Sequence, residues 1–327
     1  MTISIVCWSC SVYRSISALL TLSAALLLFI GCGEEKGRPS LSREVPVLPF
    51  TREDATNAWK AADLLVAGHT PRDAGTPEAE AAARWLLKEL KTRGITQSEV
   101  DSFTDKTPKG KKQFHNVIGH LPGTGDSWII LLSHFDTKSG IGRSFQGAND
   151  GASSTGLLLE LARSLKAAGP LRHNILLGFM DGEECQITYC PYDGFHGSKR
   201  LAGQVKRSGR RVRAVILMDM VGGRNLKLSM PYNGDGALKV LALDAAETVG
   251  FRDRIGLYDG IVYDDHQAFI DRGFPAVDLI DLAFGSAPGL NDYWHTLEDS
   301  MDKVCPESLH ISGKIVLEMV RRLEMAE

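Results

Sequence analysis

Apolar and polar residues alternate along this chain with two different periods. Short apolar runs bounded by polar residues predict buried strands. Five of them occur, at residues 114–121, 128–135, 173–180, 211–220 and 275–281. Apolar residues repeat every three or four positions, as in helices that cover a core, at residues 51–68, 76–94, 152–169 and 307–326. Strands and helices follow one another in turn, so we expect an α/β fold with a mostly parallel, mixed central sheet covered by helices on both faces.

The first fifty residues have a different pattern. Arg14 is followed by a mainly apolar run without charged residues that ends at Gly31 and Cys32. A positive charge, an apolar stretch and a small residue at the cut are the parts of a secretory signal. A cysteine directly after the small residue resembles a bacterial lipoprotein signal, in which Cys32 would carry the lipid. A plain secretory signal with an incidental cysteine is the alternative.

We therefore expect three segments: a lipoprotein-type signal peptide at 1–31, a polar, Pro-containing tether at 32–49, and one folded domain at 50–327. The protein should be exported to a bacterial cell envelope and held at a membrane by the lipid alone. Without lipidation it would be secreted or periplasmic.

Composition narrows the function classes. The chain has 327 residues, 43% of them hydrophobic, as in ordinary globular proteins. Its net charge is −3 and no basic block stands out, so we expect no nucleic-acid partner. Beyond the predicted signal peptide there is no CxxC motif, which argues against a cysteine-based zinc site in the folded domain. Export implies an oxidising compartment, where Cys185 and Cys190 could form a small disulfide loop or remain free.

Polar side chains follow the predicted strands at the points where those strands end. The carboxyl ends of parallel strands lie at one edge of a sheet, which is where ligands bind in such folds. The residues found there, with one from a late loop, are His134, Asp136, Asp150, Glu183, Glu184, Asp219 and His295. One such histidine could be structural, and one aspartate could cap a helix. So many of them at successive strand ends predict a shared site.

The residue types favour a metal. Imidazole and carboxylate groups are typical ligands of catalytic zinc. Asp181, Glu183 and Glu184 lie within four residues and would repel one another without a cation. Neighbouring side chains in extended backbone point to opposite faces, so one of the adjacent glutamates can bind a metal while the other faces the substrate as a base.

The motifs "SHFD", "GANDGASS", "DGEE", "LMDMVG" and "YWHTLEDS" stand in the order typical of metal-dependent aminopeptidases of family M28, which this chain resembles over residues 50–325. Within that family it is most similar to the glutaminyl-peptide cyclotransferases. The long insert "EECQITYCPYDGFHGSKRLA" and the stretch "YDDHQAFIDRGFPAVDLI" carry this second resemblance. The resemblance implies a zinc aminopeptidase-like catalytic domain.

The same resemblance implies a metal site. Zinc would be held by Asp150, Glu184 and His295. The aminopeptidases use two metals, and His134 and Asp219 are present here as ligands for a second ion. The cyclases resemble enzymes with one zinc, so the number of ions stays open at this point.

Further roles follow from the resemblance. Glu183 becomes the general acid and base. Asp219 and Asp265 become polar partners that shape the proton path and bind substrate. Trp294 would form one wall of the substrate pocket, and Tyr189, which stands where the cyclases usually carry Trp, would form another.

Three functions are compatible with these observations. The first is a zinc-dependent glutaminyl-peptide cyclotransferase that acts on peptides or proteins with an N-terminal Gln. The insert after the glutamate pair favours it. The second is an aminopeptidase with two zinc ions, and the third is a non-catalytic surface-binding lipoprotein. The complete set of candidate ligands argues against the third.

Overall fold

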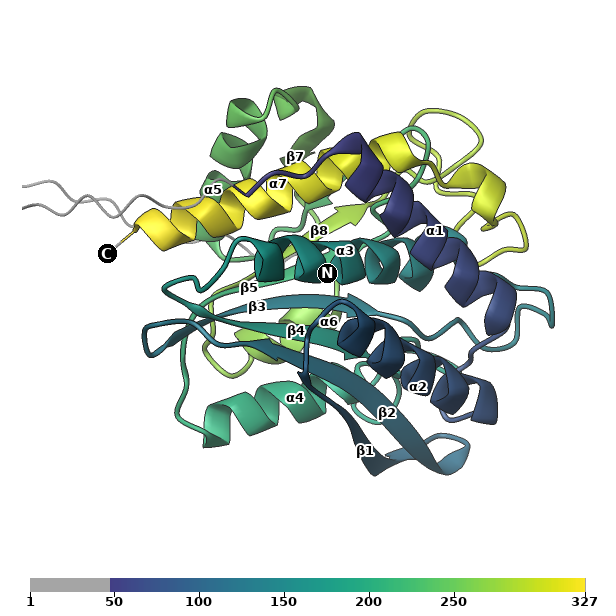
Figure 1. Cartoon of the computed structure of the whole chain (residues 1–327). Coiled ribbons are helices and arrows are strands. Elements are labelled where there is room, and N and C mark those ends of the chain that lie inside the picture. Colours follow the sequence, from purple (N-terminus) through teal and green to yellow (C-terminus); the bar gives the residue numbers. More distant parts are fainter. Residues whose placement is uncertain (1–47, 327) are drawn as a thin grey trace, which may run out of the picture. The chain divides into compact units, whose positions relative to one another are not determined.

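One eight-stranded sheet forms the centre of the fold, in the order β1-β2-β4-β3-β5-β8-β6-β7. The computed structural model describes residues 48–326, shown in Figure 1. The strands are β1 (Gln97–Thr107), β2 (Gly110–Leu121), β3 (Ser127–His134), β4 (Asn174–Met180), β5 (Arg211–Asp219), β6 (Leu228–Met230), β7 (Ile255–Leu257) and β8 (Ala276–Asp281). The signal peptide, Cys32 and nearly all of the tether predicted above lie outside the described residues.

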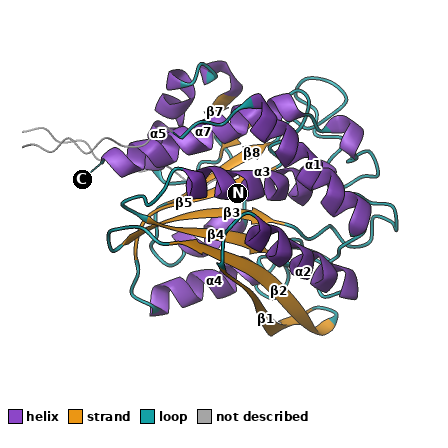
Figure 2. Cartoon of the chain, in the orientation of Figure 1, coloured by secondary structure: helices purple, strands orange, loops and turns teal. Residues whose placement is uncertain are grey.

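The helices flank this sheet, as Figure 2 shows. They are α1 (Arg52–Gly68), α2 (Pro77–Thr92), α3 (Ser154–Ala167), α4 (His196–Arg207), α5 (Gly236–Thr248), α6 (Asp265–Ile270) and α7 (Pro306–Met325). Short helical turns occur at η1 (Ala148–Ser153), η2 (Arg252–Arg254) and η3 (Met301–Lys303). Within residues 48–326, no helix combines the length and the apolar character that a bilayer span requires.

Strands β4, β3, β5 and β8 are parallel and form the middle of the sheet. Strand β2 joins β4 antiparallel and pairs with β1 in a long hairpin, while β6 joins β8 antiparallel at the other side. This mixed sheet with a parallel centre confirms the predicted fold class. The parallel centre also brings the carboxyl ends of four strands to one edge.

Side chains that alternate along the central strands explain why both faces are covered. Ile129 and Leu131 of β3 pack into one core, and Ile130 and Leu132 into the other. The first core is closed by α1, α2, α3, α5 and α7, and the smaller second core by α4 and α6. Strands that are buried on both faces need continuous runs of apolar residues, and the sequences of the central strands contain such runs.

Candidate active site

The predicted site residues do meet at one edge of the sheet. His134 is the last residue of β3 and Asp219 the last of β5. Glu183 and Glu184 follow β4, and Asp150 lies in the turn η1 before α3. The remaining member, His295, comes from the loop after β8, far along the chain from the others.

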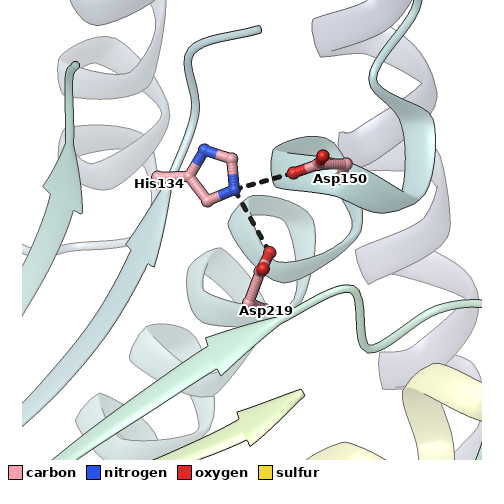
Figure 3. Close-up of side chains that lie close together, drawn as sticks. All are labelled: His134, Asp150 and Asp219. Atoms are coloured by element: carbon pink, nitrogen blue, oxygen red, sulfur yellow. Dashed lines mark hydrogen bonds and ion pairs between the residues drawn. The ribbon is translucent and has the colours of Figure 1, made fainter. Parts of the chain in front are cut away.

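Asp150 lies between two imidazoles. Figure 3 shows His134 at the end of its strand with its Nε2 atom directed at both Asp150 and Asp219. His134 Nε2 is 3.1 Å from Asp150 Oδ1 and 3.2 Å from Asp219 Oδ1. The other carboxylate oxygen, Asp150 Oδ2, lies 3.3 Å from His295 Nε2, which is also 2.8 Å from Glu184 Oε1. One carboxylate therefore joins two clusters of donor atoms.

Both clusters fit a metal ion. The donor atoms of Asp150, Glu184 and His295 all lie within 4.8 Å of one another, and so do those of His134, Asp150 and Asp219. Asp150 Oδ2 is buried and accepts no hydrogen bond, a costly arrangement that a cation would relieve. Two imidazoles with buried carboxylates and no thiolate match the ligand set of catalytic rather than structural zinc.

The charges of these groups depend on one another. Burial alone would raise the pKa of Asp150, but the neighbouring imidazoles of His134 and His295 lower it below its usual value. Burial alone would lower the pKa of His295, and its contacts with Asp150 and Glu184 instead raise it to about 9. The carboxylates thus hold positive charge strongly at this place, which is the property a cation site requires.

The backbone around Asp150 is shaped for its role. Gly147 and Gly151 have φ values of 51° and 95°, in the left-handed region that favours glycine. A Cβ atom at Gly151 would lie 3.0 Å from His134 Cε1, so the close approach of this turn to the imidazole also requires glycine. The carboxylate of Asp299 accepts hydrogen bonds from the backbone N–H groups of Asn149 and Asp150, at 2.7 and 3.1 Å. These contacts fix the direction of the Asp150 side chain.

Asp136 positions the glutamate pair. Its carboxylate accepts hydrogen bonds from the backbone N–H groups of Glu183 and Glu184, both at 3.2 Å. Its Oδ1 atom is also 3.5 Å from Nδ1 of His134. Asp136, which was expected among the strand-end residues of the site, therefore supports both candidate metal clusters rather than belonging to either.

Arg72 supports the same region from another part of the chain. Its guanidinium is fully buried and donates to the backbone carbonyls of Phe135, Gln146 and Gly147. Burial lowers the pKa of Arg72 to about 10, so the group keeps its charge at neutral pH. No motif in the sequence pointed to Arg72, because a single arginine after a helix carries no pattern.

Glu183 faces the cavity beside Tyr189. The Tyr189 hydroxyl lies 3.1 Å from Glu184 Oε2 and 3.4 Å from Glu183 Oε1. Burial raises the pKa of Glu183 well above its usual value, and the charge of Glu184 raises it further. Lys138 Nζ, 3.5 Å from Glu184 Oε2, brings a positive charge to the same wall. A carboxyl group with a raised pKa can hold a proton and release it again near neutral pH.

The loop that carries His295 is under backbone strain. His295 has a φ of 56°, which is unusual for a residue with a side chain and is found most often at functional sites. The ring of Trp294 stacks on its imidazole at 3.9 Å between centroids. Trp294 remains 41% exposed and Tyr189 38% exposed, so both rings present an open face to the cavity.

A cavity of about 260 Å³ contains these groups. Glu183, Tyr189, Asp219 and Trp294, all predicted from the sequence, line it together with the candidate metal ligands Asp150, Glu184 and His295. Asp265 is fully buried and does not line it. Its neighbour Asp264 does, and a preceding aromatic residue, Tyr263, forms part of the rim. Asp264 and Asp265 are adjacent in the sequence. The position at which α6 begins determines which of the two side chains reaches the cavity.

Asp181 and the two cysteines singled out in the sequence do not take part in the candidate site. The carboxylate of Asp181 accepts a hydrogen bond from the backbone N–H of His115 at 2.7 Å and is not part of the cavity lining. Cys185 and Cys190 are free thiols, the first buried and the second exposed. The question left open by the sequence is therefore answered in favour of free cysteines in this structure.

Comparison with known proteins extends these findings. The sequence profile of peptidase family M28 matches residues 116–320. A glutaminyl-peptide cyclotransferase of Drosophila melanogaster is 28% identical over 70% of this chain and 71% of its own length. The crystal structure of an Acidobacteriales bacterium glutaminyl cyclase has a TM-score of 0.78 and 31% identity, covering 86% of this chain and 99% of the other. A Zn-dependent exopeptidase from Parabacteroides distasonis has a TM-score of 0.73 and 28% identity, covering 84% and 99%.

Proposed function

This chain belongs to peptidase family M28 and is similar to its glutaminyl cyclases, and from that premise we propose that it is a zinc-dependent glutaminyl-peptide cyclotransferase. It would convert the N-terminal Gln of a peptide or protein to pyroglutamate and release ammonia. The observation that carries the proposal is the cavity in which Glu183, Tyr189 and Trp294 surround the cluster of Asp150, Glu184 and His295. This space is small and walled by aromatic rings, as a folded-back Gln side chain requires.

In the proposed reaction the α-amine nitrogen attacks the γ-carbonyl carbon of the same residue, and the bond from that carbon to the amide nitrogen breaks. Zinc bound by Asp150, Glu184 and His295 would supply Lewis acidity toward the γ-carbonyl oxygen. Glu183 takes the proton from the attacking amine and delivers it to the departing nitrogen, which leaves as ammonia.

The other cavity residues position the substrate and the base. Trp294 and Tyr189 provide apolar faces that hold the Gln side chain close to its own amine and limit the entry of water. The Tyr189 hydroxyl, near both glutamates, fixes the orientation of the Glu183 carboxyl. Asp264 and Asp219 line the same space and can accept hydrogen bonds from the α-amino group.

A second candidate is an exopeptidase with two zinc ions. Its support is the cluster of His134, Asp150 and Asp219, whose donor atoms are as close together as those of the first cluster. The similarity to the Parabacteroides distasonis exopeptidase favours it as well. In this function Glu183 would activate water and Asp150 would bridge the ions.

A product assay distinguishes the two functions. The purified protein is incubated with a Gln-initiated and a Leu-initiated peptide of otherwise identical sequence, and mass spectrometry follows both. Loss of ammonia from the first peptide with the second left intact supports the cyclotransferase. Removal of the first residue from the Leu peptide, with no pyroglutamate formed from the Gln peptide, replaces it with the exopeptidase.

We also propose that the enzyme is exported and anchored by a lipid on Cys32. The support is the Arg14 charge and the apolar run that ends at Gly31 and Cys32. Peptides and proteins with a newly exposed N-terminal Gln in the cell envelope would then be its substrates.

A further inference from the structure

A second cavity adjoins the catalytic one. It has a volume of about 350 Å³, within the ~300–1,000 Å³ range of small-ligand pockets. It lies between the segment that precedes α4 and the helix α6. Tyr189 and Tyr263 line both cavities, so these two side chains form a ridge between them. The proposed cyclisation reaction places no part of the N-terminal Gln in this second cavity.

The walls of the second cavity are mainly aromatic and apolar. The ring of Phe195 stacks on Tyr189, with centroids 4.8 Å apart and planes 14° from parallel. Pro191 and Tyr263 add further apolar surface, and Tyr263 is 65% exposed. Flat aromatic walls of this kind favour another aromatic ring, which gains both apolar burial and stacking.

The polar groups of the second cavity are already engaged. Lys199 Nζ donates to the carbonyl oxygens of Gly194 and Pro191, at 2.9 and 3.4 Å. Asp271 accepts a hydrogen bond of 2.6 Å from the Gln267 side chain. Because Lys199 and Asp271 carry opposite charges and already have protein partners, the cavity gives a charged side chain little net attraction to offset its lost hydration.

The position of the ridge indicates which part of a substrate reaches the second cavity. Consecutive side chains of an extended peptide point to opposite sides, and their Cα atoms are 3.8 Å apart. A peptide backbone that runs along the ridge of Tyr189 and Tyr263 with its first side chain in the catalytic cavity directs its second side chain to the opposite side of the ridge. That side is the second cavity.

We propose that the second cavity is a specificity subsite for the residue that follows the N-terminal Gln, and that it prefers an aromatic side chain there. This inference rests on the proposed cyclotransferase function. The site is held in shape before substrate arrives, because the carboxylate of Asp193 accepts hydrogen bonds from the backbone N–H groups of Gln186, Ile187 and Thr188, at 2.5, 2.8 and 3.0 Å. A preformed subsite costs little ordering when a ligand binds.

The first test compares two peptides that differ only at the second residue, Gln-Phe and Gln-Gly, with the full-length purified enzyme and an ammonia-release assay. We expect kcat/KM to be ~10–100-fold higher for Gln-Phe, chiefly through a lower KM, as burial of one large apolar side chain implies. Equal kcat/KM values for the two peptides would overturn the subsite. Absence of ammonia from both would instead refute the proposed function on which it rests.

The second test fills the cavity chemically. Cys190 lines it and is an exposed thiol, whereas Cys185 is buried. Treatment with N-ethylmaleimide should lower the kcat/KM ratio of Gln-Phe to Gln-Gly by about 10-fold. The Cys190→Ser variant, treated in the same way, should keep its ratio and so controls for modification of every other cysteine. An equal loss with both peptides, or an unchanged ratio in the labelled enzyme, contradicts the proposal.

An independent variant guards against distortion of the loop by the label. Asp271 is exposed at the end of α6 and lines the rim of the same cavity. Asp271→Trp should crowd the cavity from the opposite side and reduce the preference for Gln-Phe in the unlabelled enzyme. Retention of the full preference in this variant would mean that the second side chain binds elsewhere.

Discussion

Asp150 is the residue on which both metal clusters depend. Its two carboxylate oxygens face different imidazoles, His134 on one side and His295 on the other. Loss of this side chain would therefore disturb both clusters, whereas loss of either histidine disturbs one. The two histidines also differ in surroundings, since the His134 side chain is 1% exposed and that of His295 is 16% exposed and beside the cavity.

This difference predicts unequal effects of two alanine substitutions. His295→Ala should release most of the zinc and abolish activity. His134→Ala should cost only the roughly 10–100-fold in metal affinity that is typical when an outer partner of a ligand is lost. Elemental analysis and ammonia release on both variants measure this. Loss of a second equivalent of zinc in His134→Ala, together with turnover of Leu-initiated peptides, would instead support the two-metal exopeptidase.

Glu183→Gln should keep zinc and fold normally but lose activity by about 10²–10⁴-fold, the usual contribution of a general acid or base. The amide is nearly the same size and can still hydrogen-bond to Tyr189, but it cannot take up the proton. Glu184→Gln is the matched control and should lose zinc. If the Glu183 variant is the one that loses the metal, the roles of the two glutamates are reversed.

Asp281, away from the metal clusters, predicts a pH dependence of stability. Burial raises its pKa to about 6, although backbone N–H groups of Ala283 and Lys227 oppose the shift. The folded protein thus binds the proton more tightly than the unfolded chain does. The contribution of this group is present below pH ~4 and is lost as pH rises through 6.

Asp281→Asn removes that titration. Between pH 4 and 6 the free energy of unfolding of the wild type should fall relative to that of the variant, by roughly 1–3 kcal/mol. Urea unfolding at several pH values measures the difference. Parallel pH profiles for the two proteins would mean that Asp281 does not titrate in this range.

At the scale of helices and strands, the loop between β4 and α4 governs the cavity wall. Asp193, which is fully buried, binds three successive backbone N–H groups of this loop through its carboxylate. Tyr189 follows directly and stacks on Phe195 at the other end of the loop. The wall of the active site is thus held mainly by one side chain rather than by a regular element.

Asp193→Ala should therefore loosen the loop and lower kcat/KM for Gln peptides by about 10-fold or more, since three hydrogen bonds to the loop backbone are lost and each is typically worth about 0.5–1.5 kcal/mol. Zinc content should stay unchanged. Hydrogen exchange of residues 185–196 should rise in the variant. Asp193→Asn, which keeps one acceptor oxygen, should give a smaller change, and equal effects of both substitutions would count against this role.

Some strands, helices and site residues could be predicted from the sequence, and others could not. The central strands were predicted because burial on both faces demands continuous apolar residues. Strand β1 was missed, since it lies at the edge of the sheet and most of its residues are exposed or half-buried. Helix α6 is only six residues long, too short for a periodic pattern, and its start determines that Asp264 rather than Asp265 faces the cavity. Arg72 and Asp299 could not be found, because their roles depend on contacts with distant backbone.

At the scale of the whole molecule, the proposed anchor joins a catalytic domain to a membrane. Among residues 48–326, no helix is long and apolar enough to cross a bilayer itself. A lipid at Cys32 leaves the polar segment from residue 33 to residue 47 as the spacer. The enzyme could then act on envelope proteins near the membrane surface.

Cys32→Ser should abolish incorporation of a labelled fatty acid and move the enzyme from the membrane fraction to the soluble fraction. Activity per molecule should be unchanged, because the substitution lies outside the catalytic domain. Cell fractionation and lipid labelling measure both effects. Labelling that persists in the variant would exclude Cys32 as the modified residue.

The spacing of the three proposed zinc ligands has a consequence for how the enzyme matures. Asp150 and Glu184 lie in the middle of the chain, whereas His295 follows Glu184 by 111 residues and is near the carboxyl end. During synthesis or translocation the ligand set is incomplete until almost the entire polypeptide has emerged and the late loop has docked. A zinc ion held by these three residues would therefore be acquired as one of the last events of maturation. A polypeptide cut short before that loop cannot become a partly active enzyme.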